Sequence, residues 1–402
     1  MSSATPPQPS SIEATARIAS SIAEIRAVDW DSLANPVAST ANPFVSHAFL
    51  QALEDAGAVG GRTGWSPRHI VLERAGRLIG VAPAYLKTHS QGEYIFDHGW
   101  AEAYERAGGS YYPKLQIAVP FTPVPGPRFL VGDGPDASDN RRLLAHAAIE
   151  IARKLRVSSV HATYVDQPAW EALGGGVKPE FLQRTDQQFH WQNAGYTTFD
   201  DFLAALSSRK RKTIRKERAT ALEAGLTVKY LRGPEISESS WDAFHHFYQD
   251  TGSRKWGRPY LNRKFFSLLG ERMGNDCLLI VAERAGRPIA GALNLIGGDC
   301  LYGRYWGMTE HHPCLHFELC YYQAIDWAIA HKLPRVEAGA QGEHKLARGY
   351  NPVATYSLHW IADPGFRRAV DRYLTEERAH MAERREMLAE YAPYKKVVEE
   401  QD

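Results

Sequence analysis

The chain has 402 residues, and 44% of them are hydrophobic, which is enough apolar material for more than one core. At this length, two domains of about 100–200 residues each are expected. Its 47 basic and 46 acidic residues leave a formal net charge of +1, so any site for a polyanion must come from a local cluster. No stretch approaches the roughly 18 uncharged apolar residues of a membrane helix, which excludes a spanning segment.

The start of the chain and its cysteines favour a cytoplasmic protein. Residues 1–20 begin with a stretch rich in serine and proline and have no apolar core, so they predict a disordered tail and not a secretory signal. The four cysteines, Cys277, Cys300, Cys314 and Cys320, all lie in the second half and form no framework with the first. Reduced, buried thiols in a cytosolic protein are the simplest interpretation.

The chain contains an internal repeat. Residues 70–86 read IVLERAGRLIGVAPAYL and residues 280–296 read IVAERAGRPIAGALNLI, with nine of 17 aligned positions identical. The offset of 210 residues is about half the chain, which indicates a duplicated domain and not a short solenoid repeat. In each copy, two short apolar runs flank a polar turn, with Gly76 in the first, and this pattern predicts a hairpin.

The order of elements after each hairpin also repeats. A third strand, a helix and a last strand are predicted over 92–100, 140–156 and 157–164, and again over 298–306, 316–332 and 335–340. Helices precede the hairpins over 47–56, 241–250 and 263–273. The pattern predicts an α+β fold with two lobes, 21–195 and 196–402, and a charged helix over 364–392 that packs on the second lobe.

This order of elements resembles the GNAT acyltransferase fold, and two such units in tandem resemble the FemAB-type transferases. Several stretches are similar to the FemAB-like predicted N-acyltransferases, also called peptidoglycan biosynthesis/recognition proteins: 42–53, 90–100, 111–127, 316–323 (HFELCYYQ) and 339–350 (GAQGEHKLARGY). The resemblance implies tandem duplicated GNAT-like domains that transfer an acyl group from an activated donor to an amine. One departure is the loop 308–315 (MTEHHPCL), which lacks the glycines and arginine that hold the CoA pyrophosphate in single-domain GNAT proteins.

The second lobe carries the candidate catalytic residues. An amine must lose a proton before it attacks a carbonyl, and histidine and glutamate side chains are suited to accept that proton. The candidates are Glu318, His316, Glu343 and His344. Two alternatives stay open: residues 339–350 can form a polar surface loop, and Glu318 can satisfy the N-terminus of its helix. The cluster of histidines and cysteines over 311–320 has no matching second ligand pair, so no metal is expected.

Basic residues and glycines of the same lobe are candidates to bind the donor, because guanidinium and ammonium groups hold phosphates and carboxylates. They are Arg304, Gln341, Gly342, Lys345, Arg348, Arg211 and Arg215. The last two belong to a basic run within an expected helix over 207–220, which would place Arg211, Arg215 and Arg218 on one face. It resembles the basic helix at the lobe junction of FemAB-type enzymes. A solvated basic helix is the alternative to a site for CoA phosphates or tRNA.

Polar and aromatic residues of the first lobe predict a pocket for the acceptor, a small amine or a peptide-like molecule. They are Glu93, Asp97, Trp100, Tyr111, Tyr112 and Lys114, and an aromatic core with a polar rim is the alternative. The expected reaction uses acyl-CoA as co-substrate, without a tightly bound cofactor. The other possibilities are an aminoacyl-tRNA-dependent transferase and a non-catalytic protein that recognises cell-envelope fragments. The sequence fixes no oligomeric state.

Overall fold

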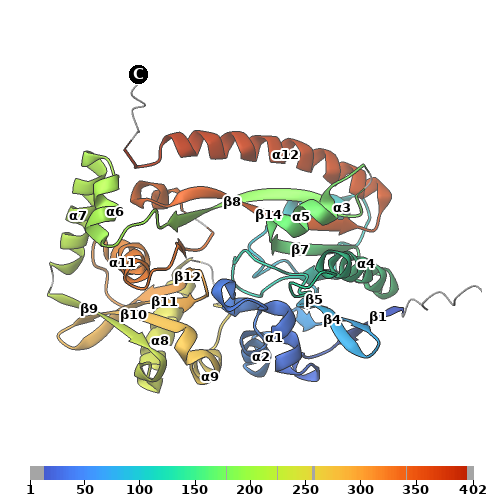
Figure 1. Cartoon of the computed structure of the whole chain (residues 1–402), viewed down its shortest axis with the longest axis horizontal. Helices are drawn as coiled ribbons and strands as arrows, with labels where there is room; N and C mark the ends of the chain where they lie inside the picture. The colour runs from blue at the N-terminus through green and yellow to red at the C-terminus, as the bar shows by residue number, and fades with distance from the viewer. Residues whose placement is uncertain (1–12, 178, 224, 256–258, 341, 396–402) are drawn as a thin grey trace, which may run out of the picture.

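The computed structural model describes residues 13–177, 179–223, 225–255, 259–340 and 342–395. Strands of both lobes form one long sheet in the order β2-β5-β6-β7-β14-β8-β13-β12-β11-β10-β9, and β1, β3 and β4 form a smaller one (Figure 1). None of the described helices is long and apolar enough to cross a bilayer.

The first lobe begins with an edge strand and closes with a long strand. Its strands are β1 (Ala14–Ala19), β2 (Trp65–Pro67), β3 (His69–Arg74), β4 (Arg77–Ala82), β5 (Ala84–Lys87), β6 (Lys114–Ile117), β7 (Ser159–Val165) and β8 (Leu182–Gln192). Its helices are α1 (Ala27–Ala34), α2 (His47–Asp55), α3 (His98–Arg106), α4 (Ala137–Leu155) and α5 (Gln167–Gly174). Residues 14–19, expected in the disordered tail, pair with β3, and residues 1–12 of that tail lie outside the described residues.

The second lobe repeats this plan. Its strands are β9 (Leu226–Arg232), β10 (Cys277–Arg284), β11 (Arg287–Ile296), β12 (Cys300–Met308), β13 (Arg335–Glu337) and β14 (Asn351–Ile361). Its helices are α6 (Phe199–Ala205), α7 (Ser208–Leu222), α8 (Glu238–Lys255), α9 (Arg263–Met273), α10 (Leu315–Phe317), the π-helix η6 (Glu318–Tyr322), α11 (Gln323–Ala330), the 3-10 helix η7 (Glu343–Arg348) and α12 (Pro364–Glu390).

The two repeated hairpins have the same turn. Ala75 and Gly76 have φ angles of 52° and 73°, and Ala285 and Gly286 have 52° and 75°. Two successive residues with positive φ are what a tight hairpin turn requires. Both ladders also shift register directly before the glutamate of ERAGR, between Leu72 and Glu73 and between Ala282 and Glu283. The sequence repeat is therefore a repeat of backbone structure, and the fold is the expected α+β pair of GNAT-like lobes.

The prediction of a third strand over 92–100 is wrong. Residues 88–97 form a loop, and α3 begins at His98, whereas the strand that pairs with β5 and β7 is β6. The physical reason is that this segment turns its two carboxylates, Glu93 and Asp97, onto the buried ammonium group of Lys114 in β6. The aromatic residues of the segment anchor that loop and do not extend the sheet.

The two lobes exchange strands where they meet. β8 and β14 pair along nine residues, from Leu182 opposite His359 to His190 opposite Asn351. Beyond this shared ladder, β8 continues onto β13 of the second lobe, and β14 pairs with β7 of the first. The main sheet is therefore continuous, and β14 lies in the first lobe's part of it although it comes near the end of the chain.

Helix α12 bridges both lobes, whereas the sequence predicted packing on the second alone. It runs along β8 and β14 across the top of the molecule in Figure 1. Its buried Val370 and Leu374 belong to one apolar cluster with Trp100 and Tyr111 of the first lobe. Because the helix covers the exchanged strands β8 and β14, its apolar side chains pack on both lobes.

Candidate active site

A small cavity lies where β12 and β13 part. The two strands run parallel only from Cys300 to Tyr302 and from Arg335 to Glu337, and β12 then continues alone to Met308. The cavity has a volume of about 100 Å³. Its lining comes from β11, β12, the start of the following helix and the end of β13: Ala292, Leu293, Asn294, Gly303, Arg304, Tyr305, Trp306, His316, Cys320, Tyr321 and Ala338.

A bulge in β12 places Arg304 at this cavity. Leu293 of β11 pairs with Tyr305, but Asn294 pairs with Gly303, so Arg304 is an extra residue in its strand. Such a bulge redirects side chains and breaks the simple alternation of faces. Regular alternation along a strand would put Tyr305 on the face opposite Arg304 and Trp306, but all three line the cavity.

Two buried polar atoms of the cavity have no hydrogen-bond partner in the described part of the chain: Asn294 Oδ1 and Arg304 Nε. The amide nitrogen of Asn294 is used, since it donates to Ala292 O at 3.2 Å and to Leu278 O at 3.4 Å. Its Oδ1 faces β12, where a Cβ at position 303 would lie 3.1 Å away. A buried unpaired acceptor costs about 1–3 kcal/mol, so its retention points to a ligand.

Arg304 is electrically neutralised by a buried glutamate. Its Nη2 donates to Glu337 Oε2 at 2.7 Å, and both side chains are almost fully buried. Burial alone would raise the pKa of Glu337, but His190, Arg304 and Arg335 hold it below its usual value. The pair therefore presents donors to the cavity without a large uncompensated charge.

His316 and His344 are brought together around Tyr321. His316 lines the cavity, and its ring centroid lies 5.3 Å from those of Trp306 and Tyr321. The hydroxyl of Tyr321 lies 2.9 Å from Nε2 of His344, which is exposed to solvent. Tyr321 therefore packs on His316 at the cavity and contacts His344 at the surface.

Lys345 is an almost fully buried cation beside the same cavity. It is 1% exposed, and its Nζ donates to Gly339 O at 2.8 Å. Burial, together with the smaller effect of the Arg304 charge, lowers the pKa of Lys345 to about 7, and ionised Cys320 opposes this shift. A buried lysine of this kind is half neutral near physiological pH and can accept a proton.

Three other predicted residues are engaged with the chain itself. Glu318 is fully buried and accepts hydrogen bonds from Arg218 at 3.1 to 3.2 Å and from Gln323 at 2.6 Å, and burial raises its pKa. Arg348 lies over the ring of Phe317 and donates to Glu217 at 2.7 Å. Glu343 is exposed and lies 2.5 Å from Arg384 of α12. Gly342 precedes η7 with a φ of 112°, and Gln341 lies outside the described residues.

The basic helix α7 packs on the second lobe, against α10, η6, η7 and β9, and lies at the left edge of Figure 1. Its arginines have different environments. Arg218 turns inward to Glu318, Arg211 is half-buried, and Arg215 is exposed and lies 3.0 Å from Asp200. Outward cations are supplied by Arg209, Lys212 and Lys216.

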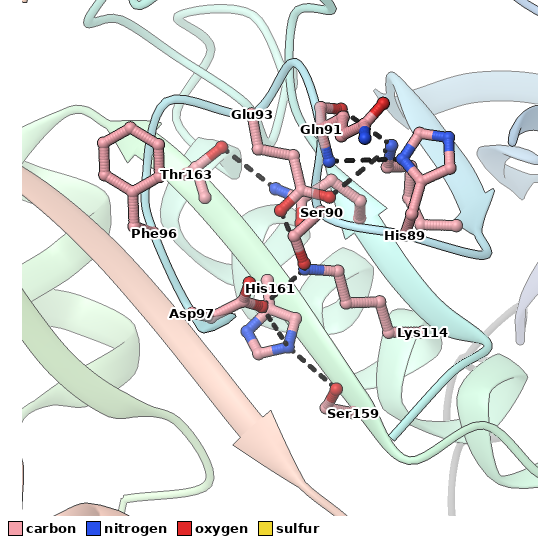
Figure 2. A network of polar contacts seen from close by, with 12 residues as sticks. His89, Ser90, Gln91, Glu93, Phe96, Asp97, Lys114, Ser159, His161 and Thr163 are labelled. Atoms are coloured by element: carbon pink, nitrogen blue, oxygen red, sulfur yellow. Dashed lines mark hydrogen bonds and ion pairs between the residues drawn. The ribbon is translucent and has the colours of Figure 1, made fainter. Parts of the chain in front are cut away.

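Three of the predicted acceptor residues of the first lobe form a buried ion cluster, and Figure 2 shows them: Glu93, Asp97 and Lys114. Lys114 Nζ donates to Asp97 at 2.5 Å, to Glu93 at 2.7 Å and to Ser90 at 2.8 Å. Lys87 Nζ lies 3.6 Å from Glu93. Burial raises the pKa of Glu93 to about 7 and lowers that of Lys87 to about 7. The carboxylates expected to recognise an amine are therefore already paired with the chain's own lysines.

Aromatic and histidine side chains surround this cluster. The Tyr111 hydroxyl donates to Asp97 at 2.6 Å, and the Tyr112 hydroxyl lies 2.8 Å from Ser90 Oγ. Trp100 packs edge-on against His359 with centroids 5.0 Å apart. His161 contacts both Tyr111 and His359, and burial lowers its pKa to about 3, so it is neutral at physiological pH.

A model of the FemAB-like family, described as peptidoglycan biosynthesis/recognition, matches residues 21–396. The chain belongs to the FemAB-like family. Among solved structures, FemX matches this FemAB-like protein with a TM-score of 0.53 and 13% identity, covering 86% of this chain and 98% of FemX. The C-terminal domain of a putative lysylphosphatidylglycerol synthetase from Agrobacterium fabrum has a TM-score of 0.51 and 10% identity, covering 88% and 97%.

A tandem GNAT protein from the clavulanic acid biosynthesis pathway has a TM-score of 0.43 and 12% identity, covering 88% of this chain and 99% of that one. No curated protein matches the chain. At these identities the first two likenesses show the fold. Together with the family, they support an acyl- or aminoacyltransferase.

Sequence reasoning about this FemAB-like protein missed three contributors to its sites. Lys87 and His161 complete the first-lobe cluster, and Asn294 supplies the unpaired acceptor of the cavity. A signal was present for two of them, because a polar side chain interrupts an apolar strand pattern at His161 and at Asn294, whereas Lys87 ends its strand. Among the described residues, no group of three or more His, Cys, Asp or Glu is arranged to hold a metal ion.

Proposed function

We propose that this FemAB-like protein transfers a small aminoacyl group from a charged tRNA to the amine of a peptide-like acceptor, at the cavity between β12 and β13. The observation that carries the proposal is the Oδ1 of Asn294 at that cavity, which has no hydrogen-bond partner among the residues that the structure describes. A carbonyl oxygen accepts hydrogen bonds only, so it suits an N–H donor such as the α-ammonium group of an aminoacyl ester.

The size of the cavity supports a small transferred group. Its volume of about 100 Å³ is below the roughly 150 Å³ of an apolar cavity that binds benzene. Tyr305 and Trp306 form apolar walls, and the neutralised pair of Arg304 and Glu337 does not repel a cation strongly. A glycyl, alanyl or seryl group is compatible with these limits.

Two features favour tRNA over CoA as the donor. The loop between β12 and α10 has neither glycine nor arginine, and its Glu310 lies 2.8 Å from Arg284 at the hairpin turn. An acidic, glycine-free loop is a poor cradle for a pyrophosphate. The outward cations of α7 lie on a helix that contacts η6 and η7, the two segments beside the cavity. Such a basic surface suits an RNA backbone, and FemAB-type transferases, which the chain resembles, use aminoacyl-tRNA.

The acid–base step would fall to the histidines. His316 lies in the cavity and can accept the proton of the attacking amine, while Tyr321 and His344 pass it to solvent. Glu318 is a weaker candidate, because it does not line the cavity and its two oxygens are held by Arg218. The acceptor would approach from the first lobe, whose Phe121 carbonyl accepts a hydrogen bond from Tyr305 at 3.2 Å.

The test measures transfer and binding with the same protein. The full chain is mixed with tRNA charged with labelled glycine, alanine or serine, together with a lysine-containing peptidoglycan-type peptide. We expect label in an amide bond of the peptide, and a thermal shift with charged tRNA but not with CoA. At a hundredfold excess over the dissociation constant, a ligand adds about 2.7 kcal/mol of stability.

Other outcomes would replace the proposal. Transfer from acetyl-CoA, with no response to charged tRNA, would establish the acyl-CoA reaction instead. Binding of the peptide without transfer from either donor, unchanged in His316→Ala, would indicate a recognition protein.

A further inference from the structure

The cavity contains a thiol whose surroundings differ from those of the other cysteines. Cys277 and Cys300 are buried in the apolar core, and burial raises the pKa of both thiols. Cys320 instead is partly exposed and lines the cavity together with His316 and Tyr321. It lies in the π-helix η6, a type of helix turn that is frequent at functional sites.

A proton acceptor lies near this thiol. Lys345 Nζ donates to Gly339 O at 2.8 Å, directly after Ala338, which lines the cavity with Cys320, and burial lowers the pKa of Lys345 to about 7. A cationic neighbour stabilises a thiolate, and a neutral lysine can take up the thiol proton. The unpartnered Asn294 Oδ1 and Arg304 Nε, both nearly fully buried, line the same cavity and are available to a bound acyl group.

We propose that Cys320 carries the acyl group covalently, as a thioester formed with Lys345 as its proton acceptor, between release of the donor and attack by the amine. The proposal rests on the function proposed above. Cysteine nucleophiles divide one difficult acyl transfer into two easier steps.

The two steps balance without any further reactant. In the first, Cys320 Sγ attacks the ester carbonyl, the thiol proton passes to Lys345 Nζ, and the carbon–oxygen bond to the ribose breaks. The departing oxygen takes the proton back from Lys345. In the second, the acceptor amine attacks the thioester, the carbon–sulfur bond breaks, His316 takes the amine proton, and the Cys320 sulfur receives a proton back from His316.

The first test uses p-nitrophenyl acetate as a small activated ester and the full chain. We expect a burst of nitrophenol and a mass increase of a single acetyl group on Cys320, which hydroxylamine removes. Cys320→Ala abolishes both signals. Cys314→Ala is the matched control and changes neither, since Cys314 is also partly exposed but does not line the cavity. Acetylation of Cys314 at the same rate as Cys320 would overturn the proposal.

Substitution of the lysine tests the proton acceptor. Lys345→Met should slow the burst about tenfold at pH 7 and move its pH midpoint toward about 8.5, the usual thiol value. Lys345→Arg keeps the positive charge but cannot accept the proton, so it should restore iodoacetamide reactivity and not the burst. Unchanged pH profiles in both variants, measured on protein with the wild-type melting temperature, would rule out this role.

A second readout separates this proposal from the function on which it rests. With charged tRNA as donor, Cys320→Ala should lose transfer at least about 100-fold. Full transfer by Cys320→Ala would mean direct attack by the amine, so the covalent step would be wrong and the proposed function right. Hydroxylamine-sensitive acetylation of Cys320 in a protein that responds to no tRNA would mean that the covalent step is right and the tRNA donor wrong.

Discussion

The two lobes place buried charge differently at equivalent points of the fold. In the first lobe, beside β6 and β7, two lysines and two carboxylates pair directly in the interior. In the second, beside β12 and β13, Arg304 pairs with Glu337, but among the described residues Lys345 donates its hydrogen bond to a carbonyl oxygen, and a cavity remains. One copy of the duplicated unit therefore uses its buried charges to fix a loop, and the other has a cavity beside its buried charges.

The largest effect is expected where oppositely charged side chains are in direct contact in the interior. Lys114→Ala would leave Glu93 and Asp97 buried with only the more distant Lys87 nearby. Removal of one partner from a buried pair usually costs about 3–5 kcal/mol. We expect a loss of this size in urea unfolding at pH 7. Lys87→Ala is the comparison, and an equal loss there would show that distance to the carboxylates does not matter.

A substitution at the cavity should lower the transfer activity and leave the stability of the protein nearly unchanged. Asn294→Leu removes an acceptor that has no partner within the described residues, together with two long hydrogen bonds, so the unfolding free energy should change by less than about 1 kcal/mol. Transfer should fall by about 10–100-fold, which corresponds to the roughly 1.5–3 kcal/mol of a charged hydrogen bond. A variant with normal kcat/KM would remove Asn294 from the donor site.

The pH dependence of the unfolding free energy also distinguishes these groups, because a raised carboxyl pKa and a lowered lysine pKa change stability with pH in opposite directions. Glu93 binds its proton more tightly in the folded state, so its contribution to stability falls as pH rises from about 4.5 to about 7. Lys87 and Lys345 bind theirs more weakly when folded, so stability rises from about 7 to about 10.5.

Each group changes the unfolding free energy by up to about 1.4 kcal/mol per pH unit within its range. Glu93→Gln should remove the fall on the acid side, and Lys345→Met should reduce the rise on the alkaline side without affecting the fall. Urea midpoints measured from pH 4 to 10 distinguish the two lobes. If Lys345→Met flattened the acid side instead, the assignment of these groups would be wrong.

The smallest effect concerns α7. Replacement of Arg209, Lys212 and Lys216 by alanine should weaken tRNA binding several-fold and reduce the salt dependence, by up to about 0.9 in log–log slope per lost phosphate contact. Stability should stay within about 0.5 kcal/mol, since these side chains are exposed. Arg17→Ala, a first-lobe surface change, is the control. An unchanged salt slope in the triple variant would place tRNA elsewhere.

The parts of the fold that depend on local pattern could be predicted from the sequence. The hairpins at ERAGR need only their turn residues, and the bounds of α9 match those expected. The segment 92–100 could not be assigned correctly, because its alternating aromatic residues fit a strand while its conformation is decided by the distant Lys114. The pairing of β14 with β7 joins residues almost 200 positions apart, and no local signal encodes it.

For the candidate site, the sequence predicted suitable residue types but not how their side chains are arranged. His316 and Arg304 do line the cavity, and Lys345 lies beside it, but Arg348 and Glu318 are held by other side chains. Their partners, Glu217 for Arg348 and Arg218 for Glu318, belong to α7, and the position of that helix follows from tertiary packing. The bulge at Arg304, which opens the cavity to Asn294, requires the register of two strands to be known.

The exchange of β8 and β14 also has a consequence for synthesis on the ribosome. β7 has no partner on its β14 side until residues 351–361 have been made. An unpaired strand edge in a nascent chain invites contacts with other chains. The first lobe therefore completes its part of the sheet only with a strand from the second lobe, and a chain that ended at residue 195 would leave this edge of β7 without its partner.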